Sequence, residues 1–260
     1  MGPLGAGDQA PGYRGDLSFV HDAGFSELAR LGASAALRLL EEAPAGPVFE
    51  VGCGGGVTAA RILAAGRDVV GVDLSPAQID LARRRVPAGE FSVASYIDAE
   101  LPPAPAAILA FGEIFNYSSD GRSGLGALAE FAARAFSALP GGGFLLFDSA
   151  GPGRAPEGAT RGFAEGPDWA ILYESSERQS PPELVREITT FRRYDGIWRR
   201  EHETHRLHLY EPRAVSSALE EVGFRVEVRP GYGESRFAPS LDVFVAHRPG
   251  GPSSGEHDPA

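Results

Sequence analysis

Lysine is absent from the 260 residues of this chain, and cysteine occurs once, as Cys53. A single cysteine cannot form a disulfide within its own chain, and proteins without disulfides are typical of the cytoplasm. No stretch approaches the roughly 18 consecutive apolar residues of a membrane-spanning helix. Residues 1–12 show neither the basic start nor the apolar stretch of a secretory signal peptide. We therefore expect a cytoplasmic protein without a membrane partner.

Positive charge is scarce as well, because the acidic residues number 35 and the basic residues 24, which gives a formal net charge of −11. Proteins that bind nucleic acids usually carry a basic patch that displaces counterions from phosphates. A DNA or RNA substrate is therefore not expected. The hydrophobic share of 43% and the charged share of 23% are typical of a globular protein, and the length suits a single α/β domain.

Short apolar runs alternate with amphipathic segments over the first 150 residues. The pattern predicts strands at 47–51, 68–72, 90–94, 106–111 and 143–147, and helices at 25–42, 58–65, 75–85 and 126–139. Ser75 and Pro76 have the residue types of a helix cap and a first helical position. Strands that alternate with helices form a mostly parallel sheet with helices on both faces.

The pattern changes after residue 167. Residues 151–167, which are rich in glycine and proline, predict a long loop. Runs of β-branched and aromatic residues then predict an antiparallel meander with strands at 169–177, 184–194 and 197–210. The last two are joined by Asp195-Gly196, a two-residue hairpin signal. A helix at 214–222 and strands at 224–228 and 241–246 are predicted to complete the chain.

Glycines cluster directly after the first predicted strand, and Asp73 ends the second. Glycine allows a tight turn and a close approach of the backbone to a ligand, and an acid at the tip of the next strand accepts hydrogen bonds from ribose hydroxyls. In the dinucleotide fingerprint Gly-x-Gly-x-x-Gly, the third glycine would stand where this chain has Val57. The sequence predicts a nucleoside site with a different glycine spacing.

The spacing Glu50-x-Gly52-x-Gly54-x-Gly56, followed by Asp73, resembles motifs I and II of the class I S-adenosylmethionine (SAM) dependent methyltransferases. The resemblance is strongest over residues 47–148, and the later element order is consistent with it. It implies an α/β fold with a doubly wound, mostly parallel seven-stranded sheet, helices on both faces, an antiparallel last pair of strands and an antiparallel meander inserted after the fifth strand.

In this interpretation one methyltransferase domain spans residues 13–248. Its expected parts are an N-terminal helical cap at 13–45, a SAM-binding core at 46–150, the inserted meander at 168–210, and a C-terminal helix with a strand pair at 211–248. The tails at 1–12 and 249–260, rich in glycine and proline, are expected to be disordered.

The resemblance also implies a SAM site at the carboxyl ends of the strands. The amides of the glycine loop would face the methionine carboxylate, and Asp73 would bind the ribose. Many family members have an acid at this point of the third strand that binds the adenine amino group. Here Ser95 and Tyr96 stand in its place, and the nearest acid, Asp98, comes slightly later in the sequence. How adenine is recognised therefore stays open. The expected cofactor-binding residues are Tyr13, Glu50, Gly52, Cys53, Gly54, Gly56, Asp73, Leu74, Ser95, Tyr96, Phe111 and Gly112.

Glu113 and His21 are the candidate catalytic residues, since an acceptor hydroxyl or ammonium must lose a proton. Glu113 follows the fourth strand, near the expected methyl position. His21 belongs to a segment that resembles the N-terminal segment folding over the cofactor in small-molecule methyltransferases. Each also has a simpler interpretation: a loop or capping carboxylate for Glu113, and a neighbour of a helix cap for His21.

The acceptor side offers further candidates. The expected substrate-binding residues are Asn116, Tyr117, His202, Tyr232 and Arg236. Because side chains alternate along a strand, His202 and His208 share one face and His205 lies on the other. This spacing argues against a three-histidine metal cluster, and no metal is expected.

The sequence thus predicts a SAM-dependent methyltransferase that acts on an oxygen or nitrogen of a small molecule. An Asn-Pro-Pro-Tyr signature and a nucleophilic cysteine outside the glycine loop are absent, which disfavours nucleic-acid methylation. Two alternatives stay open: a SAM-binding module without catalysis, and an NAD-dependent oxidoreductase. Val57 at the third fingerprint position counts against the second, and the oligomeric state is not readable from the sequence.

Overall fold

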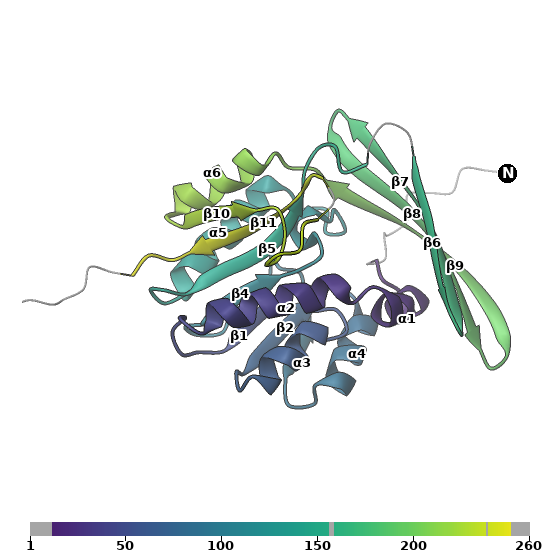
Figure 1. The fold of residues 1–260 in the computed structure, drawn as a ribbon, viewed down its shortest axis with the longest axis horizontal. Coiled ribbons are helices and arrows are strands. Elements are labelled where there is room, and N and C mark those ends of the chain that lie inside the picture. Colours follow the sequence, from purple (N-terminus) through teal and green to yellow (C-terminus); the bar gives the residue numbers. More distant parts are fainter. Residues whose placement is uncertain (1–11, 156–158, 238, 251–260) are drawn as a thin grey trace, which may run out of the picture.

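The computed structural model describes residues 12–155, 159–237 and 239–250, which form a helix-covered sheet with a second sheet beside it (Figure 1). The terminal segments 1–11 and 251–260, within the tails that we expected to be disordered, lie outside the described residues. The first sheet has seven strands in the order β10-β11-β5-β4-β1-β2-β3. Their bounds are β1 Val48–Val51, β2 Val69–Asp73, β3 Glu90–Val93, β4 Ala107–Ala110, β5 Phe144–Ala150, β10 Arg225–Arg229 and β11 Leu241–His247.

Strands β1 to β5 pair in parallel, whereas β11 pairs antiparallel with both β5 and β10. The predicted fold class is confirmed, including the antiparallel last pair. From β1 the strand order runs to β2 and β3 on one side and to β4 and β5 on the other, so it reverses at β1. Because these strands are parallel, the carboxyl ends of β1, β2 and β4 meet at the same end of the sheet. In open α/β sheets this end is where ligands bind.

Helices cover both faces of this sheet (Figure 1). One face is covered by α2 (Glu27–Leu40), α3 (Val57–Ala64) and α4 (Pro76–Arg85), and the other by α5 (Leu125–Ala138) and α6 (Pro212–Val222). The start of α4 is as predicted, with Pro76 in the first turn and the Ser75 hydroxyl accepting a hydrogen bond from the amide of Gln78. No described helix is long and apolar enough to cross a membrane.

The second sheet is antiparallel and has four strands in the order β6-β7-β8-β9. Three of them were predicted, and they are β7 (Trp169–Gln179), β8 (Pro182–Tyr194) and β9 (Ile197–His208). The fourth, β6 (Thr160–Gly166), lies in the segment that was predicted to be a loop. This strand was not predicted because its glycines, Gly162 and Gly166, are residue types that usually indicate a loop.

The glycines of β6 have a packing reason. Gly162 and Gly166 pair with Tyr173 and Trp169 of β7, and a Cβ at either glycine would collide with the aromatic ring of its partner. The rings fold across the strand where no side chain stands, a packing that rescues glycine in sheets. The strand therefore depends on its neighbour, and its own residue types do not favour it.

Helix α1 (Gly15–Gly24) was not predicted as a separate helix, and the following helix α2 begins at Glu27. Helix α1 lies between the two sheets (Figure 1). Leu17 and Val20 pack against Trp169, Ile171 and Ile188 of the second sheet. The buried carboxylate of its Asp16 is paired with two arginines of β8 and β9, which are Arg192 and Arg199.

Candidate cofactor and acceptor site

The loop after β1 is built from left-handed glycines. The φ angles of Gly52, Gly54 and Gly56 are 65°, 52° and 77°, a region that other residues adopt only at a cost. A Cβ at Gly52 would also run into the side chain of Ile114. The backbone conformation therefore requires glycine at these positions. The loop carries no side chains there, and it leads directly into α3.

Asp73 joins this loop to the end of β2. Its carboxylate accepts hydrogen bonds from the backbone amides of Gly54 at 2.9 Å and Ser75 at 2.8 Å. Burial raises the pKa of Asp73 above its usual value, although the two amides oppose the shift. Glu50 lies behind the loop, is 3% exposed, and has a pKa that burial raises to about 8.

A cavity of about 90 Å³ opens beside the loop and Asp73. Among the predicted cofactor residues, Tyr13, Gly52, Asp73, Leu74 and Tyr96 line it, and the predicted substrate residue Tyr117 does so too. The other lining residues, which sequence reasoning did not identify, are Gly12, Val51, Ala94, Ile114, Ser119 and Asp120. The acidic Asp120 comes from a loop that no motif marks. It pairs with Arg122, which also pairs with the exposed Asp98.

The segment before α1 closes one side of this cavity. The amides of Tyr13 and Arg14 donate to the two carboxylate oxygens of Glu203 on β9, at 2.8 and 3.0 Å. The Tyr13 carbonyl accepts from the hydroxyl of Ser75 at 2.7 Å, and the Tyr13 hydroxyl lies 3.1 Å from that of Tyr117. Glu203 thereby fixes the segment over the cavity, a role that nothing in the local sequence indicates.

A second cavity, of about 380 Å³, lies between α1 and the inner face of the second sheet. Its lining residues are Tyr13, Leu17, His21, Phe25, Arg154, Ala155, Thr160, Ile171, Tyr173, Ser175, Leu184, Arg186 and Ile188. Tyr13 is common to both cavities. Burial lowers the pKa of His21 to about 4, so its imidazole is neutral and only weakly basic at physiological pH.

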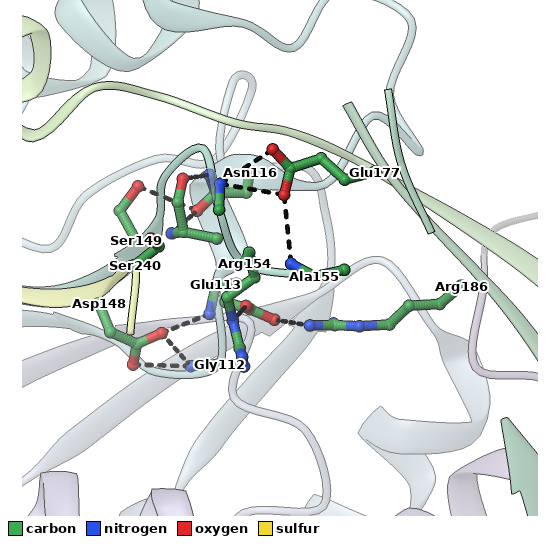
Figure 2. A network of polar contacts seen from close by, with 12 residues as sticks. Gly112, Glu113, Asn116, Asp148, Ser149, Arg154, Ala155, Glu177, Arg186 and Ser240 are labelled. Carbon is green, nitrogen blue, oxygen red and sulfur yellow. Dashed lines mark hydrogen bonds and ion pairs between the residues drawn. The ribbon is translucent and has the colours of Figure 1, made fainter. Parts of the chain in front are cut away.

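Glu113 is held in a buried network (Figure 2). Its carboxylate contacts Arg154 at 2.9 Å and Arg186 at 2.7 Å, and the residue is 5% exposed. Burial favours the neutral form, but the two guanidinium groups outweigh it and keep the pKa of Glu113 below its usual value. The two guanidinium groups engage this carboxylate, and Glu113 lines neither cavity, which favours the simpler interpretation of Glu113 as a structural residue.

Asp148 at the end of β5 supports the turn that carries Glu113. Its carboxylate accepts from the amide of Gly112 at 2.9 Å, from the amide of Glu113 at 2.5 Å and from the hydroxyl of Tyr232 at 2.7 Å. Burial raises the pKa of Asp148 to about 6. Glu113 itself has a φ of 59°, so this network stabilises a strained backbone position. Tyr232 is therefore a buried support of the turn and lines neither cavity.

The remaining predicted residues are not among those that line either cavity. Cys53 and Phe111 belong to the hydrophobic core, and Ser95 is buried. Asn116 donates to the carbonyls of Ala150 and His208, so it ties β5 to the second sheet.

The two exposed substrate candidates differ from expectation in their placement. His202 bonds with Glu187 and Thr189 on the outer face of the second sheet, because strand alternation turns it away from α1. Arg236 is exposed. No group of three or more candidate metal ligands occurs in the described part of the chain.

Comparison with known proteins agrees with this geometry. Residues 48–136 match the family described as a methyltransferase domain. No curated protein sequence matches the chain.

Solved structures of similar fold cover nearly the whole chain. A sugar N-methyltransferase from Streptoalloteichus sp. has a TM-score of 0.73 at 21% identity, covering 96% of this chain and 98% of its own. A SAM-dependent methyltransferase from Clostridium acetobutylicum has a TM-score of 0.75 at 13% identity, covering 90% and 98%. An amino pentose methyltransferase from Micromonospora echinaspora has a TM-score of 0.67 at 20% identity, covering 88% and 96%.

Fold, glycine loop and family match define the class: the chain carries a Rossmann-like methyltransferase domain of the SAM-dependent type. It is an enzyme of that class, and the amino pentose methyltransferase of similar fold is described as SAM bound. The residues of this chain fit SAM, since the bare loop and the Asp73 carboxylate flank a cavity with apolar walls from Leu74, Ala94 and Ile114. The NAD-dependent alternative is not supported.

Replacing Asp73 by Ala is expected to weaken SAM binding by about 1–3 kcal/mol, or roughly 5- to 150-fold, because charge-assisted hydrogen bonds to the ribose are lost. Calorimetric titration measures this effect. Since the carboxylate binds as the anion, wild-type affinity should fall as the pH is lowered through its raised pKa, and the affinity of Asp73→Ala should not show that dependence. Asp80→Ala, which removes an exposed acid of α4, is the control. Unchanged affinity in Asp73→Ala would show that another group anchors the ribose.

Proposed function

We propose that this enzyme transfers the methyl group of SAM to a nitrogen or oxygen atom of a small molecule held in the 380 Å³ cavity. The observation that carries the proposal is that Tyr13 lines both cavities, so a ligand in each would meet beside its ring. The volume of the second cavity is in the usual range of small-molecule sites. Polymeric substrates would need an open groove in its place.

The expected mechanism relies on position more than on acid–base assistance. When bound, SAM supplies an activated methyl group on a good leaving group. Holding the acceptor in line is then worth up to about 7–11 kcal/mol of the barrier. The segment at Tyr13, fixed by Glu203 and Ser75, orders the boundary between the two sites. The neutral His21 is placed to take the proton that the acceptor loses.

Nitrogen is the acceptor atom that we favour. Two similar structures belong to proteins described as a sugar N-methyltransferase and a glycopeptide N-methyltransferase, and a third to one described as an amino pentose methyltransferase. An amine also suits a mild base, because an ammonium group loses its proton far more readily than an alcohol. A hydroxyl acceptor is the second outcome that the experiment below distinguishes.

Incubation of the protein with methyl-labelled SAM and a small-molecule cell extract should yield a labelled product and S-adenosylhomocysteine. Mass spectrometry then identifies the product and the methylated atom. Heat-inactivated protein is the control for spontaneous methylation. If SAM binds by calorimetry but no extract yields a labelled product, the protein is better described as a SAM-binding module.

A further inference from the structure

The charges around the second cavity are one-sided. Two arginines, Arg154 and Arg186, line it, whereas no aspartate or glutamate appears among its described lining residues. This is unusual in a chain with a formal net charge of −11. The two side chains are about one-fifth exposed, at 22% and 19%, so solvent screens them only in part.

Both arginines share a single counter-charge. Glu113 binds Arg154 through its Nε and Arg186 through one terminal nitrogen (Figure 2). Two positive charges against one negative charge leave an excess of one. Figure 2 shows Arg186 reaching Glu113 from one side, while Asp148 lies on the other side of the turn. An unbalanced charge that is only partly solvated is destabilising, so a ligand that neutralises it gains affinity.

The two neighbouring acids are engaged elsewhere. Asp148 accepts from two backbone amides and from Tyr232. Glu177 accepts from the amides of Gly153 and Ala155 at 2.9 and 3.2 Å, and so shapes the loop that carries Arg154. Neither acid lines the cavity. The uncompensated charge therefore faces the space in which we place the acceptor.

The rest of the cavity separates into two kinds of surface. Thr160, Tyr173 and Ser175 supply hydroxyl groups from the second sheet, and Leu17 and Phe25 supply apolar surface from the side of α1 and α2. A guanidinium group offers five N–H donors in a planar fork that matches carboxylate and phosphate oxygens. The pairs with Glu113 use one nitrogen of each arginine, so both forks have donors beyond those pairs.

We propose that the methyl acceptor carries an anionic group, a carboxylate or a phosphate, which Arg154 and Arg186 bind. The proposal rests on the proposed function, because it assigns the second cavity to the acceptor. Binding this group at the arginines would fix one end of the acceptor and present its other end toward Tyr13 and His21. Neutral and purely cationic amines would leave the excess charge unpaired and would be poor substrates.

The first test uses the labelled product from the extract. At about pH 11, where an alkylammonium group has largely lost its proton, it should be retained on a strong anion exchanger and released by salt. Label in the flow-through would overturn the proposal while leaving the proposed function intact.

Two variants locate the anionic group. Arg154→Gln leaves Arg186 and Glu113 as a balanced pair, so the protein should keep its fold, while the acceptor KM rises about 10- to 100-fold with little change in kcat. The matched control is Arg161→Gln, which removes an arginine of β6 that is 75% exposed and paired with Glu174. An equal change of KM in both variants, or no change in Arg154→Gln, would contradict the assignment.

A binding experiment needs no turnover. Acetate and inorganic phosphate are added separately to the protein saturated with S-adenosylhomocysteine, at constant ionic strength with chloride as reference. A rise in melting temperature that is reduced in Arg154→Gln supports the site, with acetate indicating a carboxylate and phosphate a phosphoryl group. No rise with either anion would overturn the proposal. Anion binding without any labelled product would instead contradict the proposed function and leave the anion site standing.

Discussion

Replacing His21 by Asn is expected to lower kcat by about 10²-fold, the low end of the usual contribution of a general base, without changing SAM affinity. The imidazole lines the second cavity beside Tyr13, with the ring centroids 5.0 Å apart. Burial keeps the ring neutral, so a ring nitrogen can accept the acceptor's proton, but the low pKa makes it a weaker base than an ordinary histidine. Steady-state kinetics with the acceptor identified by labelling, and calorimetry for SAM, measure the two quantities.

The pH dependence gives the same hypothesis a second readout. A base must be unprotonated, and the pKa of His21 lies at about 4. The wild-type rate should therefore be independent of His21 ionisation above about pH 5 and fall as the pH approaches 4, whereas His21→Asn should lack this inflection. His202→Asn is the control, since His202 pairs with Glu187 on the outer face of the second sheet. A kcat within twofold of wild type in His21→Asn would remove His21 from the mechanism.

Replacing Glu113 by Ala is expected to lower the free energy of unfolding by about 3–5 kcal/mol, because one partner of a buried ion pair is removed and the others stay uncompensated. The variant would lose the contacts of this carboxylate with Arg154 at 2.9 Å and with Arg186 at 2.7 Å, and both arginines would be left without it. Denaturant unfolding measures this loss. Glu174→Ala breaks the surface pair with Arg161 and should change stability by no more than about 0.5–1 kcal/mol.

The double variant Glu113→Ala with Arg154→Gln should recover part of the lost stability, since one of the two orphaned charges is gone. The acid dependence has a definite sign as well. The pKa of Glu113 is lower in the folded protein than its usual 4.5, so its contribution is full above that pH and is lost as the pH falls further. A stable Glu113→Ala with a selective loss of kcat would instead return Glu113 to the role of base.

The sequence was sufficient for the parts of the molecule whose signals are local. Apolar alternation and helical periodicity placed the strands and helices of the core within a few residues, because burial on one face imposes a period of two or 3.6. The left-handed glycines at 52, 54 and 56 had to be glycine whatever the ligand. Asp73 was predictable for a related reason, since neighbouring parallel strands end at one edge and so bring its carboxylate to the Gly54 amide.

The sequence was not sufficient for interactions between distant segments. Glu203 meets Tyr13 across 190 positions, and Arg186 meets Glu113 from another sheet; no periodicity or motif marks such pairs. Strand β6 and helix α1 were missed because their stability comes from partners, the rings of Tyr173 and Trp169 for β6 and the second sheet for α1.

The amino-acid sequence by itself determined the sheet, the glycine loop and the class of cofactor, because backbone strain and burial act on neighbours along the chain. Only the tertiary structure decided what surrounds the acceptor cavity. It set Glu113 apart as an ion-paired support, placed neutral His21 in the cavity wall, and left Arg154 and Arg186 facing the same space. These roles depend on burial and on charge balance among segments that meet only after folding.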